Sequence, residues 1–340
     1  MTLKISIVDQ SPVHGSHPKI DAPSLTLELA QLADRSGYHR YWVAEHHDSV
    51  HFANPCPEIL VATIAAQTKN LRVGSGGVML SHYSPLKVAE TFSMLANLHP
   101  GRIDLGVGRA PGGSHQTTTA LAFPYRPNNG ELYASQATQL VDFIHSESHT
   151  QGGGKWNPFA AIRVLPDASR KPQLWMLGSS GGSAELAGRL GYDLALARFI
   201  DPDGCSPEVF QRYDQARRDA GHSPSAGKML AVACICADTD EEARLRAGTA
   251  VYRKLAAQLG QREDFLTPSE VQNRYKALSL SQQSVYDHIL TGYTVGSPSR
   301  CYDELHRLAD QYQCEEITTV TVTHSQAERL HSYELLATNW

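Results

Sequence analysis

Three consecutive residues with acid–base side chains, Glu45, His46 and His47, follow an apolar run that begins at Tyr41. Because imidazole titrates near neutral pH, one of the two histidines could act as a general acid or base. His51 lies four residues after His47, so a metal site is a second possibility. The zinc motif H-E-x-x-H is absent, however, and adjacent side chains at a strand end point to opposite sides. In a third, structural interpretation Glu45 binds a backbone N–H and one histidine is simply buried; we favour the acid–base role.

Glycine, serine and arginine follow three further apolar runs. Gly76 and Gly77 end one run, Arg109 follows the next, and residues 178–183 lead from a third run into a helical pattern. Free N–H groups at a helix N-terminus suit a phosphate, and an arginine can contact the same anion through two hydrogen bonds. Tight turns alone would explain any single glycine cluster. The combination favours a phosphate site made of Arg109, Gly178, Ser179, Ser180, Gly181, Gly182 and Ser183.

Two common nucleotide-binding motifs are missing. The chain has no G-x-x-x-x-G-K-[ST] sequence, which excludes a P-loop enzyme. Gly106 and Gly108 have the spacing of the first two glycines of a dinucleotide motif, but Pro111 stands where the third would be. We therefore expect no nicotinamide site of the usual kind.

These side chains need a scaffold that brings strand ends together. Apolar runs centred near residues 5, 42, 74, 105, 176, 195, 233 and 320 alternate with helical patterns such as residues 23–36 and 58–68. Eight strands, each followed by a helix, predict an α/β fold, the (β/α)₈ TIM barrel; an open doubly wound sheet is the alternative. The active site of a TIM barrel lies at the carboxyl ends of its strands, so the residues above would converge there.

The regular alternation is interrupted twice. Residues 110–172, after the fourth strand, are rich in Gly, Pro, Ser, Thr and Asn, and residues 260–290 follow the seventh strand. We predict a single domain over residues 1–340, because TIM barrels use this much chain in one unit. Residues 110–129 and 260–288 are candidate lids over the site. His14, His17 and His82 lie in loops that could share its mouth.

Composition restricts the class of partner and the compartment. The chain is 41% hydrophobic with a formal net charge of −5 and no long basic run, so we expect neither nucleic acid nor a membrane surface as a partner. No segment has the pattern of a signal peptide or a transmembrane helix. The six cysteines contain no C-x-x-C pair, which predicts reduced thiols and a cytoplasmic protein.

Five segments together resemble the bacterial luciferase-like flavin-dependent monooxygenases. Residues 42–47 (WVAEHH), 71–77 (LRVGSGG) and 101–109 (GRIDLGVGR) occur in the order and spacing of that family, and residues 177–180 and 323–336 are similar to it as well. The resemblance implies a TIM barrel that uses reduced FMN and molecular oxygen to oxidise a small organic substrate. It also implies a homodimer, and the missing nicotinamide site suggests a separate flavin reductase.

The resemblance also implies roles for individual residues. His46 would serve in catalysis, Glu45 would contact the flavin region, and Arg109 with the serines near Ser179 would hold the FMN phosphate. A cis peptide bond behind the flavin ring would join Gly76 and Gly77.

Two departures and three alternatives accompany this interpretation. Gly108 and Gly178 stand where the light-emitting members carry a reactive cysteine and an acidic residue, so light emission is not expected. A deazaflavin-dependent oxidoreductase is the first alternative, although those members commonly carry aspartate at the position of Glu45. A non-catalytic FMN-binding flavoprotein and a hydrolytic metal barrel using His46, His47 and His51 are the others.

Overall fold

Parallel strands close into a barrel in the computed structural model of the protein, which describes residues 3–15, 21–128, 130–145, 159, 161–167, 170–223 and 226–338. Eight strands pair in the order β1-β2-β3-β4-β5-β6-β7-β9, and β9 pairs with β1 to close the ring. The strands are β1 Lys4–Asp9, β2 Arg40–Val43, β3 Arg72–Met79, β4 Ile103–Gly108, β5 Gln173–Gly178, β6 Asp193–Ala197, β7 Lys228–Cys236 and β9 Glu316–Val320. The eight predicted strands and the (β/α)₈ barrel are confirmed, and the open sheet is excluded.

A ninth strand, β8 Tyr293–Gly296, lies outside this ring. It pairs in parallel with the last residues of β7, from Ala233 to Cys236. This strand was not predicted, because four residues are too few to show a strand period.

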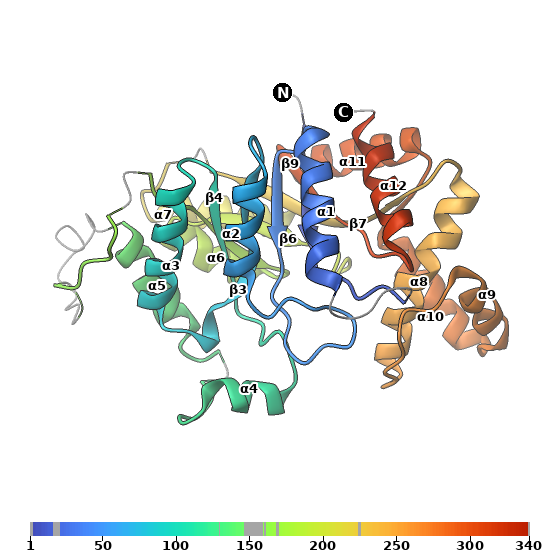
Figure 1. Cartoon of the computed structure of the whole chain (residues 1–340), viewed down its shortest axis with the longest axis horizontal. Helices are drawn as coiled ribbons and strands as arrows, with labels where there is room; N and C mark the ends of the chain where they lie inside the picture. Colours follow the sequence, from blue (N-terminus) through green and yellow to red (C-terminus); the bar gives the residue numbers. More distant parts are fainter. Residues whose placement is uncertain are drawn as a thin grey trace.

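Helices surround the barrel, and Figure 1 shows α1, α2 and α3 side by side in front of the strands. Prolines in the first turn begin several of these helices, because a proline nitrogen needs no hydrogen-bond partner there. The surrounding helices are α1 Ala22–Arg35, α2 Pro57–Gln67, α3 Pro85–Leu98, α6 Gly181–Leu190, α7 Glu208–Asp219, α8 Asp240–Gln258, α11 Pro298–Tyr312 and α12 Gln326–Ala337.

Alternation along the strands divides the core into two parts. On β2, Tyr41 and Val43 belong to the large cluster shared with the helices, whereas Trp42 belongs to a second cluster. Trp42 meets Trp175 of β5 edge to face, with ring centroids 5.3 Å apart. Because β2 and β5 are not neighbours in the ring, this contact crosses the barrel interior. The interior is therefore filled by side chains.

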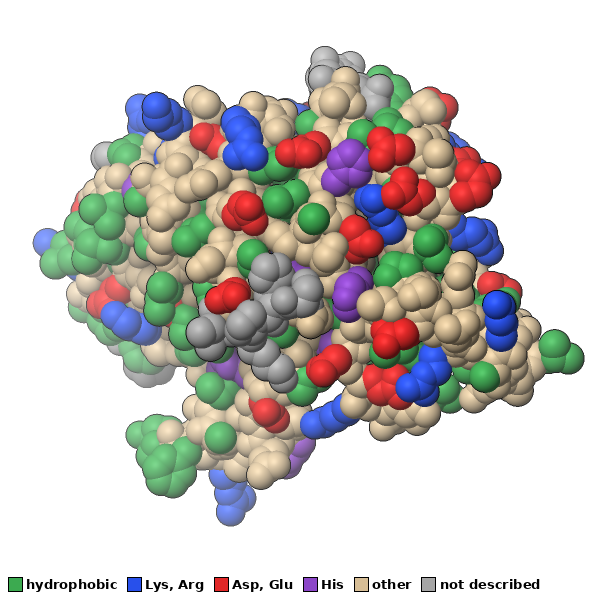
Figure 2. Space-filling view, turned by 45° about the vertical axis from the view of Figure 1, so that its right-hand side comes forward, with side chains coloured by type: hydrophobic (Ala, Val, Ile, Leu, Met, Phe, Trp, Pro, Cys, Tyr) green, Lys and Arg blue, Asp and Glu red, His purple; other side chains and the backbone are tan. Residues whose placement is uncertain are grey.

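The two predicted insertions follow β4 and β7. The first contains α4 His115–Ala122 and α5 Tyr133–Ile144, and Figures 1 and 2 show α4 projecting below the barrel. Phe123 and Tyr125, just after α4, are each 82% exposed. Since α4 follows the carboxyl end of β4, it marks the end of the barrel where a TIM-barrel site lies.

The second insertion forms two helices, α9 Pro268–Ala277 and α10 Leu280–Thr291. Thr267 and Glu270 form a capping box at the start of α9. Val271 and Tyr286 of these helices are buried in a cluster with residues of α8 such as Val251. This part of the candidate lid 260–288 is therefore folded against the barrel wall, and its function as a lid stays a prediction.

Cysteines and helix lengths give two further observations. All six cysteines are unpaired; Cys56 is partly buried and the other five are buried. Over the described ranges, none of the helices is both long and apolar enough to cross a membrane.

Candidate active site

His46 follows the carboxyl end of β2 and is held by its backbone. Its N–H donates to the carbonyl of Asn54 over 2.8 Å, and its ring lies against Phe52 with centroids 4.7 Å apart. Its Nδ1 atom is buried without a hydrogen-bond partner among the described residues. Burial lowers the pKa of His46 to about 4, and the positive charge of Arg253 adds to this effect. The imidazole is therefore neutral at physiological pH, and its Nδ1 is an unsatisfied polar atom.

Glu45 is fully buried and its two oxygens bind residues from three segments. Oε1 accepts hydrogen bonds from His47 Nε2 and the Tyr83 hydroxyl, both at 2.7 Å, and Oε2 accepts from the Met79 N–H at 3.0 Å. Burial, followed by the charge of Glu45, raises the pKa of the Tyr83 hydroxyl well above its usual value. Glu45 thus ties the end of β2 to the end of β3, which agrees with the structural interpretation of this residue. The histidines are separated: His47 binds Glu45, and His46 does not.

Gly76 and Gly77 lie within β3, and the peptide bond between them is cis, as the resemblance implied. A Cβ atom on Gly76 would lie 3.0 Å from the Cβ of Trp42, and one on Gly77 would lie 2.7 Å from the carbonyl oxygen of Gly106. Such distances leave no room for a side chain. Bare backbone therefore forms this part of the barrel wall.

A cavity of about 400 Å³ opens beside His46. Its lining combines apolar residues, among them Phe199 and Val322, with two cationic side chains of α8, Arg253 and Lys254. This pair was not predicted as part of the site. The sequence feature that could have indicated it is two adjacent basic residues within a helix whose flanking residues Val251, Tyr252, Leu255 and Ala256 are buried.

The predicted phosphate loop lies at the carboxyl end of β5 and the start of α6. Ser180 is the N-cap of α6, yet its side chain makes no capping hydrogen bond, so it does not occupy the N–H groups of the first turn. Gly178 packs under Ser183, because a Cβ on Gly178 would lie 2.5 Å from that of Ser183, whereas Gly182 faces open space. Residues 178–183 therefore form an open helix N-terminus of the kind that binds anions.

Arg109 follows β4, the neighbour of β5, and the pairing of Val107 with Met176 brings the two strand ends side by side. The side chain of Arg109, however, lies beside Gly130 and lines a different cavity of about 490 Å³ together with His82. The structure thus places Arg109 at the neighbouring strand end without directing its guanidinium to the serines.

Arg212 of α7 stands closer to the predicted phosphate loop. Its Nη1 atom is 2.6 Å from the position that a Cβ on Gly181 would occupy. This cation was missed because only the packing of α7 against α6 brings it to the loop, and no local sequence signal marks it.

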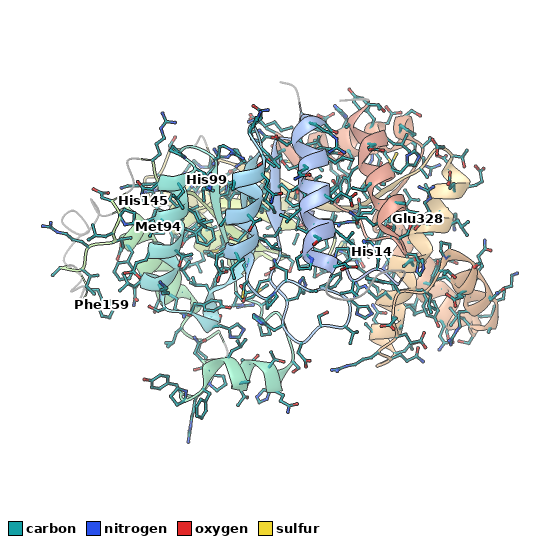
Figure 3. The ribbon with its side chains drawn as sticks, viewed as in Figure 1. His14, Met94, His99, His145, Phe159 and Glu328 are labelled. Atoms are coloured by element: carbon teal, nitrogen blue, oxygen red, sulfur yellow. The ribbon has the colours of Figure 1, made fainter. Side chains whose placement is uncertain are left out.

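The other described histidines that the sequence suggested for the site each have a separate partner. His51 Nε2 binds the Glu263 carbonyl at 2.6 Å, His82 Nε2 binds the Pro111 carbonyl at 2.8 Å, and His14 Nε2 binds Gln326 at 3.1 Å. Figure 3 places His14 near the lower end of α1. No group of three or more potential metal ligands occurs among the described residues, and His47 and His51 bind different partners. His17 lies outside the described residues.

Comparison with known proteins places the chain in one family. Residues 1–312 match the family model described as luciferase-like monooxygenase. The N-acetyl-S-alkylcysteine monooxygenase of Bacillus subtilis (strain 168) is 34% identical over 98% of this chain and 97% of its own length. A luciferase-like monooxygenase of Escherichia coli (strain K12) is 33% identical over 98% and 96%. The crystal structure of apo-MsnO8 is similar with a TM-score of 0.84 and 37% identity, covering 99% of this chain and 98% of the other. On the strength of this full-length agreement, the chain belongs to the luciferase-like monooxygenase family.

Proposed function

We propose that this protein is a monooxygenase that uses reduced FMN and molecular oxygen to oxidise a small organic substrate. The observation that carries the proposal is the buried, unpartnered Nδ1 of a neutral His46 beside a cavity of about 400 Å³ at the carboxyl ends of the strands. An orphaned polar atom at such a place is typical of a site completed by a ligand.

The residues present fit FMN at both ends of that molecule. Residues 178–183 would receive the phosphate on the N-terminus of α6, with Arg212 as the nearby cation. A contact of Arg109 with the phosphate stays a prediction. We further propose that the flat ring system lies beside the backbone of Gly76 and Gly77, which is the contact that the resemblance implies. When bound, reduced FMN would supply the electrons that activate oxygen.

Protein side chains have three tasks in this proposal. His46, neutral at working pH, accepts or holds a proton at its free ring nitrogen. Glu45 acts as a positioning residue: by binding His47, Tyr83 and Met79 it fixes the end of β2 relative to β3. Direct contact of Glu45 with the flavin stays a prediction. Apolar lining residues such as Phe199 limit the water in the cavity.

The proposal includes the setting of the enzyme. Because no nicotinamide motif is present in the sequence, a separate reductase would deliver the reduced FMN. We further propose one domain over residues 1–340, a homodimer and a cytoplasmic location, which rest on the resemblance and on composition.

Anaerobic titration of the purified full-length protein with reduced FMN, followed by mixing with oxygen, tests the proposal. We expect saturable binding and a transient near-ultraviolet absorbance that persists longer than in free solution. Failure to bind either redox form of FMN would refute the proposal. Reduced F420 in a parallel titration is the control for the cofactor class, and tighter binding of F420 than of FMN would overturn the FMN assignment.

A further inference from the structure

The cavity beside His46 contains two positive charges and no negative one. Arg253 and Lys254 line it, and none of its lining residues is Asp or Glu. The Arg253 guanidinium lies 5.3 Å from the centroid of the Phe52 ring. Lys254 Nζ donates to the Phe199 carbonyl at 2.6 Å and lies 4.8 Å from the centroid of the Tyr293 ring. Over the described ranges neither cation forms an ion pair with a carboxylate, so this part of the protein carries an uncompensated positive charge.

Such an arrangement is unfavourable in the absence of a ligand. The Nε atom of Arg253 is buried and has no hydrogen-bond partner among the described residues. Burial lowers the pKa of Arg253, and it lowers that of Lys254 to about 8, with Arg253 as the second cause. An arginine remains protonated in proteins, so it cannot relieve the penalty by losing its charge. A partly buried charge without a counter-ion is a feature of sites that receive the counter-ion from a ligand.

The phosphate loop is a separate place in the molecule. No residue from 178 to 183, and neither Arg109 nor Arg212, lines the cavity beside His46. An anion bound at Arg253 would therefore be a second one, close to His46 rather than at the N-terminus of α6.

We propose that this cavity binds the substrate as an organic carboxylate, held by Arg253 and Lys254 with its apolar part beside His46. This inference rests on the proposed function. The forked guanidinium matches the two oxygens of a carboxylate, and Lys254 supplies a point charge. Phe199, Ile200 and Val322 provide apolar wall for the remainder of the molecule.

Paired probes of equal size test the proposal. Isothermal titration of the full-length protein with butanoate, hexanoate and octanoate is compared with titration of the corresponding amides. A charge-assisted contact predicts that the carboxylates bind at least about tenfold more tightly than the amides. Equal affinities for the two series would overturn the proposal.

Substitutions locate the effect. Arg253→Gln and Lys254→Gln should each weaken carboxylate binding about tenfold and leave amide binding within about twofold. Arg244→Gln, the same change on an exposed part of α8, is the matched control and should alter neither. Circular dichroism establishes that each variant is folded; if Arg253→Gln unfolds, Lys254→Gln and Arg253→Lys decide the question. Carboxylate binding that survives both substitutions in folded protein would contradict the proposal.

Reduced FMN binding, measured for every variant, separates this inference from the function it rests on. Normal FMN binding combined with no preference for carboxylates overturns the substrate class alone. Loss of FMN binding in Arg253→Gln, with no carboxylate preference in the parent, assigns Arg253 to the flavin and overturns the inference. Carboxylate binding by a protein that binds no FMN refutes the proposed function, and with it the assignment of the anion as substrate.

Discussion

Two charged clusters in the barrel differ in their partners: the paired cluster has carboxylates, and the unpaired cluster beside His46 has none among the described residues. Near the amino ends of the strands, Arg40 contacts Asp104 at 2.7 Å and Glu316 at 2.9 Å. At the carboxyl ends, Arg253 and Lys254 border a cavity that contains no carboxylate. The side chains of Arg40, Asp104 and Glu316 are all at least 90% buried, so their charges are balanced within the protein.

The same difference appears in the pKa values of the arginines in the two clusters. Burial alone would lower the pKa of Arg40, but attraction from Asp104 and then Glu316 raises it. Burial lowers the pKa of Arg253, and no carboxylate in the described part of the chain counteracts it. The paired cluster around Arg40 holds strands β2, β4 and β9 together, whereas the unpaired charges of Arg253 and Lys254 are destabilising alone and suited to a ligand.

The largest effect on stability is expected from removing the carboxylate of Asp104 from the paired cluster. Asp104→Asn would leave Arg40 and Arg72 without the carboxylate they share and should lower the free energy of unfolding by about 3–5 kcal/mol, measured by urea denaturation. The control Glu304→Gln removes an exposed pair with Arg307 and should change it by about 0.5 kcal/mol or less. Similar losses in the two variants would remove the basis of the comparison.

At the cavity beside the unpaired cluster, His46→Ala should lower kcat about 100-fold or more, because the positioned proton acceptor is lost. Reduced FMN binding should remain within about twofold, since the phosphate loop is intact. Steady-state turnover with an identified substrate, alongside FMN titration, measures both. His222→Ala, on a partly exposed histidine after α7 that does not line the cavity, is the control. Unchanged turnover in His46→Ala would remove this residue from the mechanism.

Substituting one arginine in each cluster compares how the two clusters contribute to the free energy of unfolding. Arg253→Met removes an uncompensated charge and should raise the free energy of unfolding by about 1 kcal/mol. Arg40→Met leaves Asp104 and Glu316 without their shared cation and should lower it by about 3 kcal/mol or more. If both variants are destabilised equally, the distinction between the paired and the unpaired cluster is wrong.

The smallest effect concerns pH. Because the pKa of Lys254 is about 8, raising the pH from 7 to 9 removes its charge and should weaken carboxylate binding about threefold to tenfold. A bound carboxylate raises this pKa, so the decline reports the free protein. The nearby groups do not titrate in this range: the pKa of His46 is about 4, that of Tyr293 is raised by burial to about 12, and Arg253 stays charged.

Lys254→Arg is the matched variant for this pH dependence. A guanidinium keeps its charge up to pH 9, so the decline should disappear while amide binding remains flat in both proteins. A decline of the same size in Lys254→Arg would assign the pH dependence to another group.

Local patterns in the sequence predicted most of the scaffold. Strand and helix periods predicted the eight barrel strands. This scaffold could be predicted because hydrophobic periodicity acts between residues close in the chain. The strand-end residues Glu45, His46, Gly76 and Gly77 were proposed as site residues because a barrel gathers strand ends at one face, and their roles stay predictions.

Contacts between distant segments could not be derived in the same way. The pairing of β8 with the end of β7, the approach of Arg212 to Gly181 and the position of Arg253 beside His46 each depend on how helices dock on the barrel. The contacts of Glu45 with Tyr83 and Met79 likewise join different strand ends. Helix docking is set by packing summed over many side chains, and no local pattern encodes it.

The sequence by itself therefore determined the barrel, the order of its strands and the residue types at its carboxyl end. Only the tertiary structure decided which of those side chains are satisfied and which are not. Glu45 and His47 satisfy one another, while His46, Arg253 and Lys254 meet at a cavity without a negative charge. The physical reason is that hydrogen bonding and counter-charge depend on three-dimensional neighbours, which the chain acquires only when it folds.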